Sequence, residues 1–355
     1  MGITGIWPYL GDGEVVPIVQ LASEHFQRYG RPFRIAIDEA QWRFNNLNDG
    51  QVANIRKSSD AAQFSNPIEK AIFYRVTGLL RQNIELIFVF DGPKRPWKKG
   101  RNSGNKVNYE RIEMTKNIFK NLRVPFHLAP GEAEAECARL QQAGIVDAVW
   151  SDDSDALMFG CDFLIRTHYA MGANGKAKEG PKSKTHMRVY RSEALRKLPK
   201  LANMDKHGMV LFALLNGGDY DAAGLRGCGP ETAIRAVGMG FGQSLANFDP
   251  KSPGYGLVEW RLQLSSKFGL HVPMDFPPQR AWNYYCNPTV TQDLSMFDTL
   301  WDPRSIEESV CIFSICFKCF TLHVSRSFAC QRLLNRMFLS ILVCRQCIEL
   351  AVSDA

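Results

Sequence analysis

Carboxylate side chains follow three short apolar segments of this 355-residue chain, at the points where the segments end. The segments are F-R-I-A-I-D at 33–38, I-E-L-I-F-V-F-D at 84–91 and D-A-V-W-S-D-D-S-D at 147–155. A carboxylate at the end of a buried segment is costly to desolvate unless it is paired or holds a metal. Two further acids open a predicted helix, and one more follows a second predicted helix. The candidates are therefore Asp38, Asp91, Glu132, Glu134, Asp153, Asp155 and Asp219.

Seven carboxylates in one pocket require cations, because like charges raise one another's energy. Oxygen ligands of this kind select Mg²⁺ or Mn²⁺. Two such ions about 4 Å apart can activate a water molecule and stabilise the leaving oxygen of a phosphodiester. Each acid alone also has a structural explanation: Glu132 and Glu134 complement a helix dipole, and Asp38 caps a turn. The occurrence of the whole set in this order favours the metal site.

Helical patterns lie between the apolar segments. Apolar residues recur at spacings of 4, 4 and 3 in Ile68, Ile72, Val76 and Leu79. Pro130 and Gly131 precede the strong helix former E-A-E-A-E-C-A-R-L-Q-Q-A, and M-V-L-F-A-L-L at 209–215 is typical of a buried helix. This alternation predicts an α/β fold with a mostly parallel central sheet flanked by helices. Ligands of such sheets bind beyond the carboxyl ends of the strands, where these acids lie.

The basic residues are concentrated in two segments. The chain carries 43 Lys and Arg against 36 acids, a formal charge of +7. Residues 93–111 have a net charge of +6 and residues 176–200 of +7, so the remainder is net acidic. Gly and Ser interleave both segments, which predicts loops rather than helix faces. A solvated linker is the alternative for either segment alone, but two basic loops beside an acidic core favour binding to a phosphate backbone.

The composition excludes several classes of protein. Hydrophobic residues make up 45% and charged residues 22%, which excludes a disordered, collagen-like or disulfide-dense chain. No uncharged apolar run reaches 18 residues, so we expect no membrane-spanning helix. The segment M-G-I-T-G-I-W-P lacks the layout of a signal peptide, and therefore reduced thiols are expected.

The last 45 residues differ from the rest, because they hold six of the ten cysteines. Two C-x-x-C pairs, Cys316/Cys319 and Cys344/Cys347, could bind structural zinc. The glycines typical of zinc knuckles are missing, so we favour a tail at 306–355 that is poorly ordered and outside the main fold.

Several motifs together resemble the XPG/flap-endonuclease superfamily of structure-specific nucleases. They are M-G-I-T-G-I-W-P, A-I-D, F-V-F-D-G-P, A-P-G-E-A-E-A-E-C-A, S-D-D-S-D-A-L-M-F-G and G-G-D-Y followed by G-L-R-G-C-G-P-E-T-A, in the family's order from residue 2 to about 240. The resemblance implies that the seven acids named above bind two Mg²⁺ ions, with Mn²⁺ able to substitute. Asp152 and Glu136 fall outside that set.

The resemblance also implies contacts with DNA. Lys98 matches the basic residue that contacts the scissile phosphate, with Arg101 or Lys106 as a second such residue. The segment 224–233 resembles the family's helix–two-turn–helix, where glycines let backbone N–H groups approach a phosphate and Pro230 opens a helix. A bound K⁺ is implied there. The other residues implied to contact DNA are Gly2, Lys182, Lys184, Gly227 and Gly229.

Within the superfamily, the Holliday-junction resolvase branch fits best. Glu132 lies only 41 positions after Asp91, whereas flap endonucleases carry a longer segment here that threads a free 5′ end. The basic insert at 172–190 and the segment 275–290 resemble that branch, although its usual chromodomain is not found. The alternatives are a flap endonuclease or 5′ exonuclease of the same family, and a catalytically silent junction-binding protein. A small-molecule phosphatase would need neither the basic loops nor the glycine-rich element.

These inferences together predict the organisation and setting of the protein. A nuclease domain is expected at 1–305, with an N-terminal part at about 1–95, an internal part at about 120–215, the helix–two-turn–helix at about 216–240 and duplex-binding helices to about 300. The expected substrate is branched double-stranded DNA, four-way junctions and 5′ flaps, in repair and recombination. The resemblance further implies a nuclear protein with no membrane association that can form a homodimer on a four-way junction.

Overall fold

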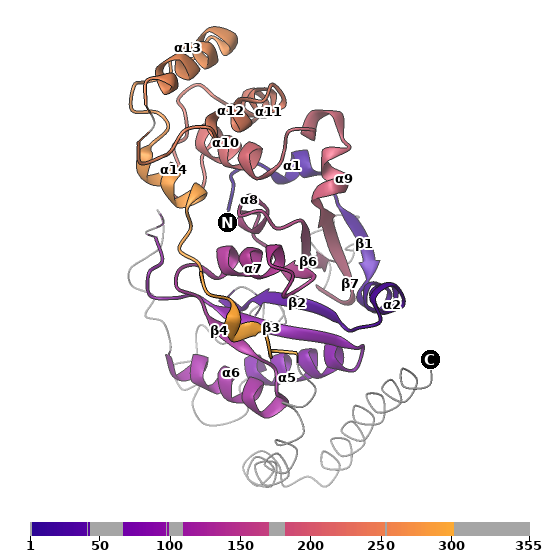
Figure 1. Ribbon diagram of the computed structural model, residues 1–355. Helices are drawn as coiled ribbons and strands as arrows, with labels where there is room; N and C mark the ends of the chain where they lie inside the picture. Colours follow the sequence, from indigo (N-terminus) through magenta and orange to yellow (C-terminus); the bar gives the residue numbers. More distant parts are fainter. Residues whose placement is uncertain are drawn as a thin grey trace, which may run out of the picture.

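A computed structural model describes residues 2–40, 42, 67–96, 98, 109–169, 182–252 and 254–301. A seven-stranded sheet lies at its centre, and helices from the second half of the chain lie above the sheet in Figure 1. The strands are β1 (Glu14–Pro17), β2 (Phe33–Asp38), β3 (Ile84–Phe90), β4 (Phe126–Leu128), β5 (Ala148–Trp150), β6 (Phe163–Tyr169) and β7 (Lys182–Arg191).

The sheet is mostly parallel, as the sequence predicts. Its strand order is β1-β7-β6-β5-β2-β3-β4, and only the pairs β6–β7 and β7–β1 are antiparallel. The chain builds β3 and β4 on one side of β2 and then returns to add β5 and β6 on the other side. The strand order therefore reverses between β2 and β5, which is where ligands bind in open sheets of this kind.

Helices cover both faces of the sheet. Those in the first two thirds of the chain are α1 (Trp7–Leu10), α2 (Ile18–Tyr29), α5 (Pro67–Leu80), α6 (Tyr109–Leu122), α7 (Ala133–Gln142), α8 (Asp155–Met158), α9 (Ser192–Arg196) and the short 3₁₀ turn η1 (Pro199–Leu201). Successive residues of a strand point to opposite faces. Accordingly, Ile35 and Ile37 of β2 share a core with α2, α5 and α6, whereas Ala36 belongs to the core that contains α7, α8 and α10.

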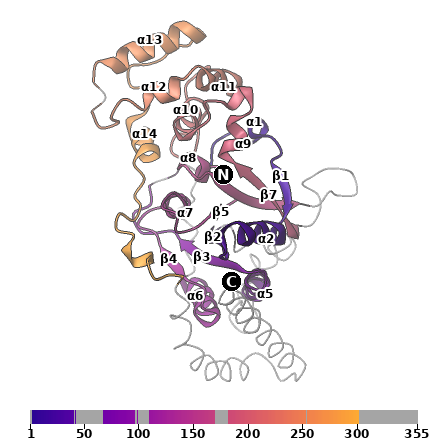
Figure 2. The ribbon, with the colours of Figure 1, turned by 45° about the vertical axis from the view of Figure 1, so that its right-hand side comes forward.

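The remaining elements are α10 (Lys206–Asn216), α11 (Pro230–Gly238), α12 (Phe241–Leu245), α13 (Gly256–Phe268), α14 (Gln279–Cys286) and the 3₁₀ turn η2 (Ser295–Phe297). Their buried side chains belong to the same core as α7 and α8, so these helices are packed on the sheet layer. After α14 the chain runs back past α7 to β4, as both Figure 1 and Figure 2 show. We call this returning segment, residues 287–301, the strap.

Local sequence explains the helix boundaries. The predicted helix at 209–215 is α10, whose first turn is capped by Asp205, since the Gly208 N–H donates to its carboxylate at 2.9 Å. The helix ends before Gly217, which has φ +92°. The glutamate-rich segment forms α7, and the pattern from Ile68 to Leu79 lies within α5. These predictions are confirmed.

One sequence expectation is wrong. Within the basic segment 176–200, Lys182–Arg191 forms β7, which pairs with both β1 and β6, and Ser192–Arg196 forms α9. The interleaved Gly and Ser suggested a loop, but the buried Met187, Val189 and Tyr190 fix this segment in the sheet. Tertiary packing overrides local composition in such strands.

Other expectations lie outside the described residues. These are Arg101, Lys106 and the 306–355 tail with its four paired cysteines. In the part of the chain that the structure describes, no helix has the length and apolar character needed to cross a membrane.

Candidate active site

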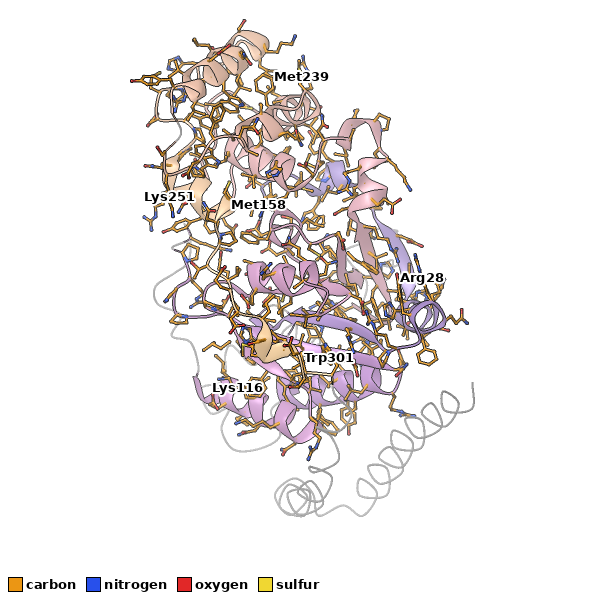
Figure 3. The ribbon with its side chains drawn as sticks, viewed as in Figure 1. Arg28, Lys116, Met158, Met239, Lys251 and Trp301 are labelled. Carbon is orange, nitrogen blue, oxygen red and sulfur yellow. The ribbon has the colours of Figure 1, made fainter. Side chains whose placement is uncertain are left out.

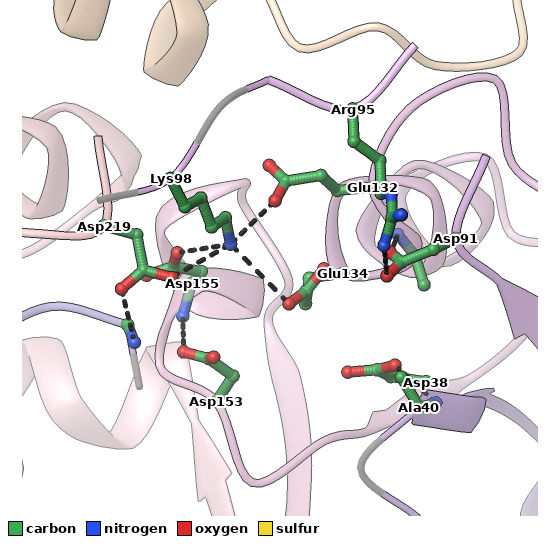
Figure 4. Close-up of polar contacts among 12 residues, drawn as sticks. Asp38, Ala40, Asp91, Arg95, Lys98, Glu132, Glu134, Asp153, Asp155 and Asp219 are labelled. Carbon is green, nitrogen blue, oxygen red and sulfur yellow. Dashed lines mark hydrogen bonds and ion pairs between the residues drawn. The ribbon is translucent and has the colours of Figure 1, made fainter. Parts of the chain in front are cut away.

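The seven predicted acids come together at the carboxyl ends of the strands (Figure 4). Asp38 ends β2, Asp91 follows β3, and Asp153 and Asp155 follow β5. Glu132 and Glu134 lie at the start of α7, and Asp219 follows α10. Five of them, Asp38, Glu132, Glu134, Asp153 and Asp155, are buried, while the side chain of Asp219 is 20% exposed. The reversal of strand order between β2 and β5 thus places acids from distant parts of the sequence together.

Lys98 lies among four of these carboxylates. Its Nζ is 2.7 Å from Glu132 Oε1, 3.0 Å from Asp219 Oδ2, 3.7 Å from Asp155 Oδ2 and 3.9 Å from Glu134 Oε1. Burial would lower the pKa of Lys98, but the charges of Glu134, Asp155 and Glu132 raise it above the ordinary value. The ammonium therefore stays charged and acts as a cation for the acid cluster.

A second cation reaches the cluster from the same loop. Arg95 NH1 lies 2.7 Å from Asp91 Oδ2. The other oxygen of Asp91 accepts a hydrogen bond of 3.1 Å from the Ala133 N–H, in the first turn of α7. Asp91 is thus held between a guanidinium and the positive end of a helix dipole.

Burial and mutual repulsion alter the protonation of the cluster. Burial is the largest cause of a raised pKa at Glu134. The charge of Lys98 opposes this effect, but repulsion from Asp91, Glu132 and Asp153 adds to it, so that the pKa is raised to about 8. Burial is also the largest cause of the raised pKa values of Asp38, Asp153 and Asp155, and neighbouring acids add to it. A bound multivalent cation would lower these pKa values, because it favours the ionised carboxylates.

The donor set suits a hard cation. Among the described residues, both carboxylate oxygens of Asp155 are buried without a hydrogen-bond partner, as expected of a metal ligand. Within the described ranges, no three acidic, histidine or cysteine side chains stand in an arrangement that would by itself hold a metal ion. Lys98 is instead the nearest cation to four of the acids. The assignment of the acids as metal ligands therefore stays a prediction.

The beginning of the chain is built into the cluster. The Gly2 N–H donates to Asp219 Oδ1 at 3.0 Å, and the Ile3 N–H donates to Ser154 Oγ at 2.9 Å. Gly2 has φ +86°, and a Cβ added there would lie 1.9 Å from Asp153 Oδ1. Only glycine fits this position. The predicted DNA contact at Gly2 stays untested, but its place beside the acids is a finding.

Sequence reasoning missed Tyr220, which follows Asp219. Its hydroxyl donates to Glu132 Oε2, and Lys98 Nζ lies 5.5 Å from the centre of its ring. The ring also packs against Tyr285 of α14, with centroids 4.6 Å apart. Tyr220 thus touches both the acid cluster and the helices above it. The sequence offers one signal, its adjacency to Asp219, and that signal says nothing of Glu132.

The predicted helix–two-turn–helix, at about 216–240, starts at the end of α10 and includes α11. Gly227 has φ +82°, Gly229 is the N-cap of α11, and Pro230 occupies the first turn. Nothing lies within 4 Å of a Cβ added at Gly229, so this turn is open to a close approach. Lys182 and Lys184 lie at the start of β7, away from α11 in Figure 1. The two groups of predicted DNA contacts therefore occupy different parts of the molecule.

Comparisons with known proteins identify a matching family model and similar structures. The XPG I-region family model matches residues 123–219, which include Glu132, Glu134, Asp153, Asp155 and Asp219. A structure of the eukaryotic junction-resolving enzyme GEN-1 with caesium is 33% identical, covers 85% of this chain and 68% of that protein, and has a TM-score of 0.66. A structure of the Holliday junction-resolving enzyme GEN1 with product DNA and Mg²⁺ is 34% identical, covers 84% and 68%, and has a TM-score of 0.62.

Two curated relatives are more distant. DNA repair protein RAD2 of Saccharomyces cerevisiae is 26% identical over 232 residues, which is 62% of this chain and 21% of that protein. Flap endonuclease 1 of Ignicoccus hospitalis is 26% identical over 269 residues, 67% of this chain and 70% of that protein. The chain thus spans about a fifth of the length of RAD2 but more than two thirds of the flap endonuclease.

Proposed function

The chain belongs to the XPG/flap-endonuclease superfamily of structure-specific nucleases, and on this premise we propose that it is an endonuclease that hydrolyses phosphodiester bonds in branched DNA. The observation that carries the proposal is the gathering of seven carboxylates at the reversal of strand order, with two cations from one loop among them. Such a surplus of buried negative charge is costly unless a ligand offsets it.

We assign Asp38, Asp91, Glu132, Glu134, Asp153, Asp155 and Asp219 as the residues that hold two divalent ions, Mg²⁺ or Mn²⁺. Bound ions of this kind supply charge stabilisation at the phosphate and lower the pKa of the attacking water. Structures of GEN1 in complex with product DNA and Mg²⁺, and with product DNA, Mg²⁺ and Mn²⁺, support this assignment.

The chain's own cations prepare the site for a phosphate. Lys98 offsets the charge of the carboxylates, and we assign it as the contact of the scissile phosphate, with Arg101 and Lys106 as candidates for a second contact. Arg95 holds Asp91 against the first turn of α7. Tyr220 donates a hydrogen bond to Glu132 and so fixes the direction of that carboxylate.

Duplex DNA is proposed to bind at the turn before α11. Gly227 and Gly229 leave the backbone accessible there, and the dipole of α11 favours a phosphate. Structures of GEN-1 binding with potassium, sodium and caesium support a monovalent cation in such an enzyme. We propose K⁺ at this turn. Lys182 and Lys184 are proposed as further backbone contacts. The expected domain boundaries, with a nuclease domain at 1–305, are part of the same proposal.

The substrate class follows from the short segment between Asp91 and Glu132. Because a long threading segment is not needed for a junction without a free end, we propose four-way junctions and 5′ flaps as substrates. Identity to the GEN1 structures is 32–34%, against 24% for the catalytic core of Rad2, which supports this branch. A homodimer on the junction and a nuclear location complete the proposal.

A panel of defined substrates tests the proposal. Flap, fork, four-way and linear duplexes are incubated with the full chain, with Mg²⁺ and with a chelator. We expect incision of four-way and flap substrates only with Mg²⁺, and no loss when the 5′ end is blocked. Loss on blocking would indicate the flap-endonuclease alternative. Binding of four-way DNA without any incision would indicate a silent junction-binding protein.

A further inference from the structure

Glu136 is a buried acid that the nuclease chemistry does not use. It is the third glutamate of the E-A-E-A-E segment and is completely buried. His127 Nε2, on β4, lies 3.0 Å from its Oε1. The Thr291 N–H donates to its Oε2 at 2.9 Å, and Thr291 Oγ1 lies 3.2 Å from the same nitrogen of His127. Both oxygens of Glu136 are therefore engaged, by a neighbouring strand and by the strap.

The strap is fixed at several further points. Phe297 is buried and packs edge-on against His127, with ring centroids 5.0 Å apart. Trp301, labelled in Figure 3, donates from Nε1 to the carbonyl of Ile145 at 3.0 Å. At the other end of α7, a Cβ on Gly131 would lie 2.5 Å from the carbonyl oxygen of Thr289, so the strap passes close to the residues that precede the helix. The strap thus follows α7 along its length.

Two neighbouring acids of α7 point to opposite sides. Residues two apart on an α-helix are separated by about 200° around the axis. Glu134 accordingly reaches the acid cluster, whereas Glu136 reaches the strap. Any movement of α7 about its axis must change both contacts together.

The contacts of Glu136 favour its charged form. Burial would raise the pKa of its carboxyl, but the hydrogen bonds from His127 and Thr291 hold the pKa below the ordinary value. Loss of either partner leaves a buried polar group unsatisfied, which is more costly than the bond is favourable. The network therefore resists rotation of the helix.

We propose that Glu136 is a positioning residue which, together with His127 and Thr291 of the strap, fixes the rotation of α7 and so sets where Glu132 and Glu134 stand for the divalent ions. This inference rests on the proposed metal assignment. It gives the strap a function, since residues far from the acids in sequence control the geometry of the acids. Groups that orient metal ligands typically change metal affinity by about 10- to 100-fold when removed.

The test measures Mn²⁺ binding by the full-length chain without DNA, by calorimetry. In Glu136→Met the side chain keeps its length but loses both hydrogen bonds, and we expect Mn²⁺ affinity to fall about 10-fold. Glu136→Gln keeps an acceptor for the Thr291 N–H and is expected to restore most of that affinity. Junction affinity, measured in chelator, should stay within about threefold in both variants.

Matched controls separate positioning from general destabilisation. Ile72→Ala removes a buried side chain in the opposite layer and should lower the melting temperature without changing Mn²⁺ affinity. If Glu136→Met does not fold, Thr291→Val replaces it: this variant keeps the backbone N–H that bonds Glu136 but loses the hydroxyl contacts with His127 and Glu136. It should weaken Mn²⁺ binding about threefold, whereas Thr299→Val on the exposed part of the strap should not.

The outcomes also separate this inference from the proposed function. A wild-type chain that binds no Mn²⁺ and cuts no substrate overturns the metal assignment and the inference with it. A wild-type chain that binds Mn²⁺ and cuts DNA, beside folded Glu136→Met or Thr291→Val with unchanged Mn²⁺ affinity, overturns the inference alone.

Discussion

At the end of the sheet where the strands begin, Asp147 is enclosed by partners, whereas at the end where they finish, seven acids share two cations. Arg31 contacts both oxygens of Asp147 at 2.6 and 2.8 Å, and the Arg34 N–H donates to it at 2.8 Å. Arg34 in turn pairs with Glu85 at 3.0 Å. In the described residues, two arginines thus balance two acids at this end, while Lys98 and Arg95 face seven at the other.

The difference teaches how to separate a structural acid from a functional one. Both ends place carboxylates at strand termini of the same sheet, so a position at a strand end does not by itself distinguish them. At the balanced end, each of the two acids has an arginine partner. The unbalanced end carries raised pKa values and two unsatisfied oxygens on Asp155, and so requires further positive charge.

The largest expected effect comes from replacing one acid at the unbalanced end. Asp153→Asn or Asp155→Asn should reduce incision by more than about 100-fold, the upper end for loss of a group that only orients a metal ligand. Junction binding should stay within a few-fold or tighten, because repulsion of phosphate falls. Incision and gel-shift affinity are measured on the same samples. Retained incision in both variants would contradict the metal assignment.

Removal of one acid should change the melting temperature in opposite directions at the two ends of the sheet. In chelator, Asp155→Asn should melt higher than wild type, since it removes a charge from a repelling set. Asp147→Asn, the control at the balanced end, should melt at a lower temperature. We expect it to lose roughly 2 kcal/mol of unfolding free energy, because Arg31 is left without its carboxylate partner. Incision by Asp147→Asn should persist at temperatures where it is folded.

Gly2 provides the next effect. In Gly2→Ala the new methyl group would meet Asp153 Oδ1, and the backbone at φ +86° disfavours any side chain. We expect incision to fall by about 10-fold or more, comparable to the loss of an orienting group. Gly11→Ala is the matched control, because Gly11 has φ +73° but nothing within 4 Å of an added Cβ. Equal activity of the two variants would show that space beside Asp153 is irrelevant.

Removal of one hydroxyl should have a smaller effect. Tyr220→Phe keeps the ring against Tyr285 but loses the hydrogen bond to Glu132, so we expect the Mg²⁺ concentration for half-maximal incision to rise by up to about 10-fold. Tyr284→Phe is the control, since its hydroxyl bonds Arg280 instead. An unchanged Mg²⁺ requirement in Tyr220→Phe would remove Tyr220 from the site.

The smallest expected effect concerns the basic strand. Replacing Lys182 and Lys184 with Ala should weaken DNA binding equally on unrelated sequences and reduce its salt dependence by roughly one unit of slope per lost contact. The measurement is affinity against salt concentration for two junctions of different sequence. A loss confined to one sequence, or an unchanged slope, would count against backbone contact.

Short-range pattern was enough to predict the sheet and the gathering of the acids. Asp38, Asp91, Asp153 and Asp155 follow apolar segments, and parallel strands finish at one edge. The same reasoning failed for Lys182–Arg191, where pairing with β1 and β6 overrides a loop-like composition. It also missed Tyr220, Arg95 and the contacts of Glu136. Arg95 lies four residues after Asp91, and His127 lies nine residues before Glu136. The other contacts join residues far apart in the sequence, such as Tyr220 with Glu132, 88 positions apart, and Thr291 with Glu136, 155 positions apart. No local pattern encodes such pairs.

Ion stoichiometry tests the central claim most directly. The full-length, DNA-free chain is titrated with Mn²⁺ by calorimetry, beside Asp153→Asn, Asp155→Asn and the balanced-end control Asp147→Asn. If the unbalanced acids hold divalent ions, the wild type and Asp147→Asn should bind two ions per chain, and the two cluster variants should bind fewer or bind far more weakly. Equal Mn²⁺ binding by all four folded proteins, or none by the wild type, would contradict the account.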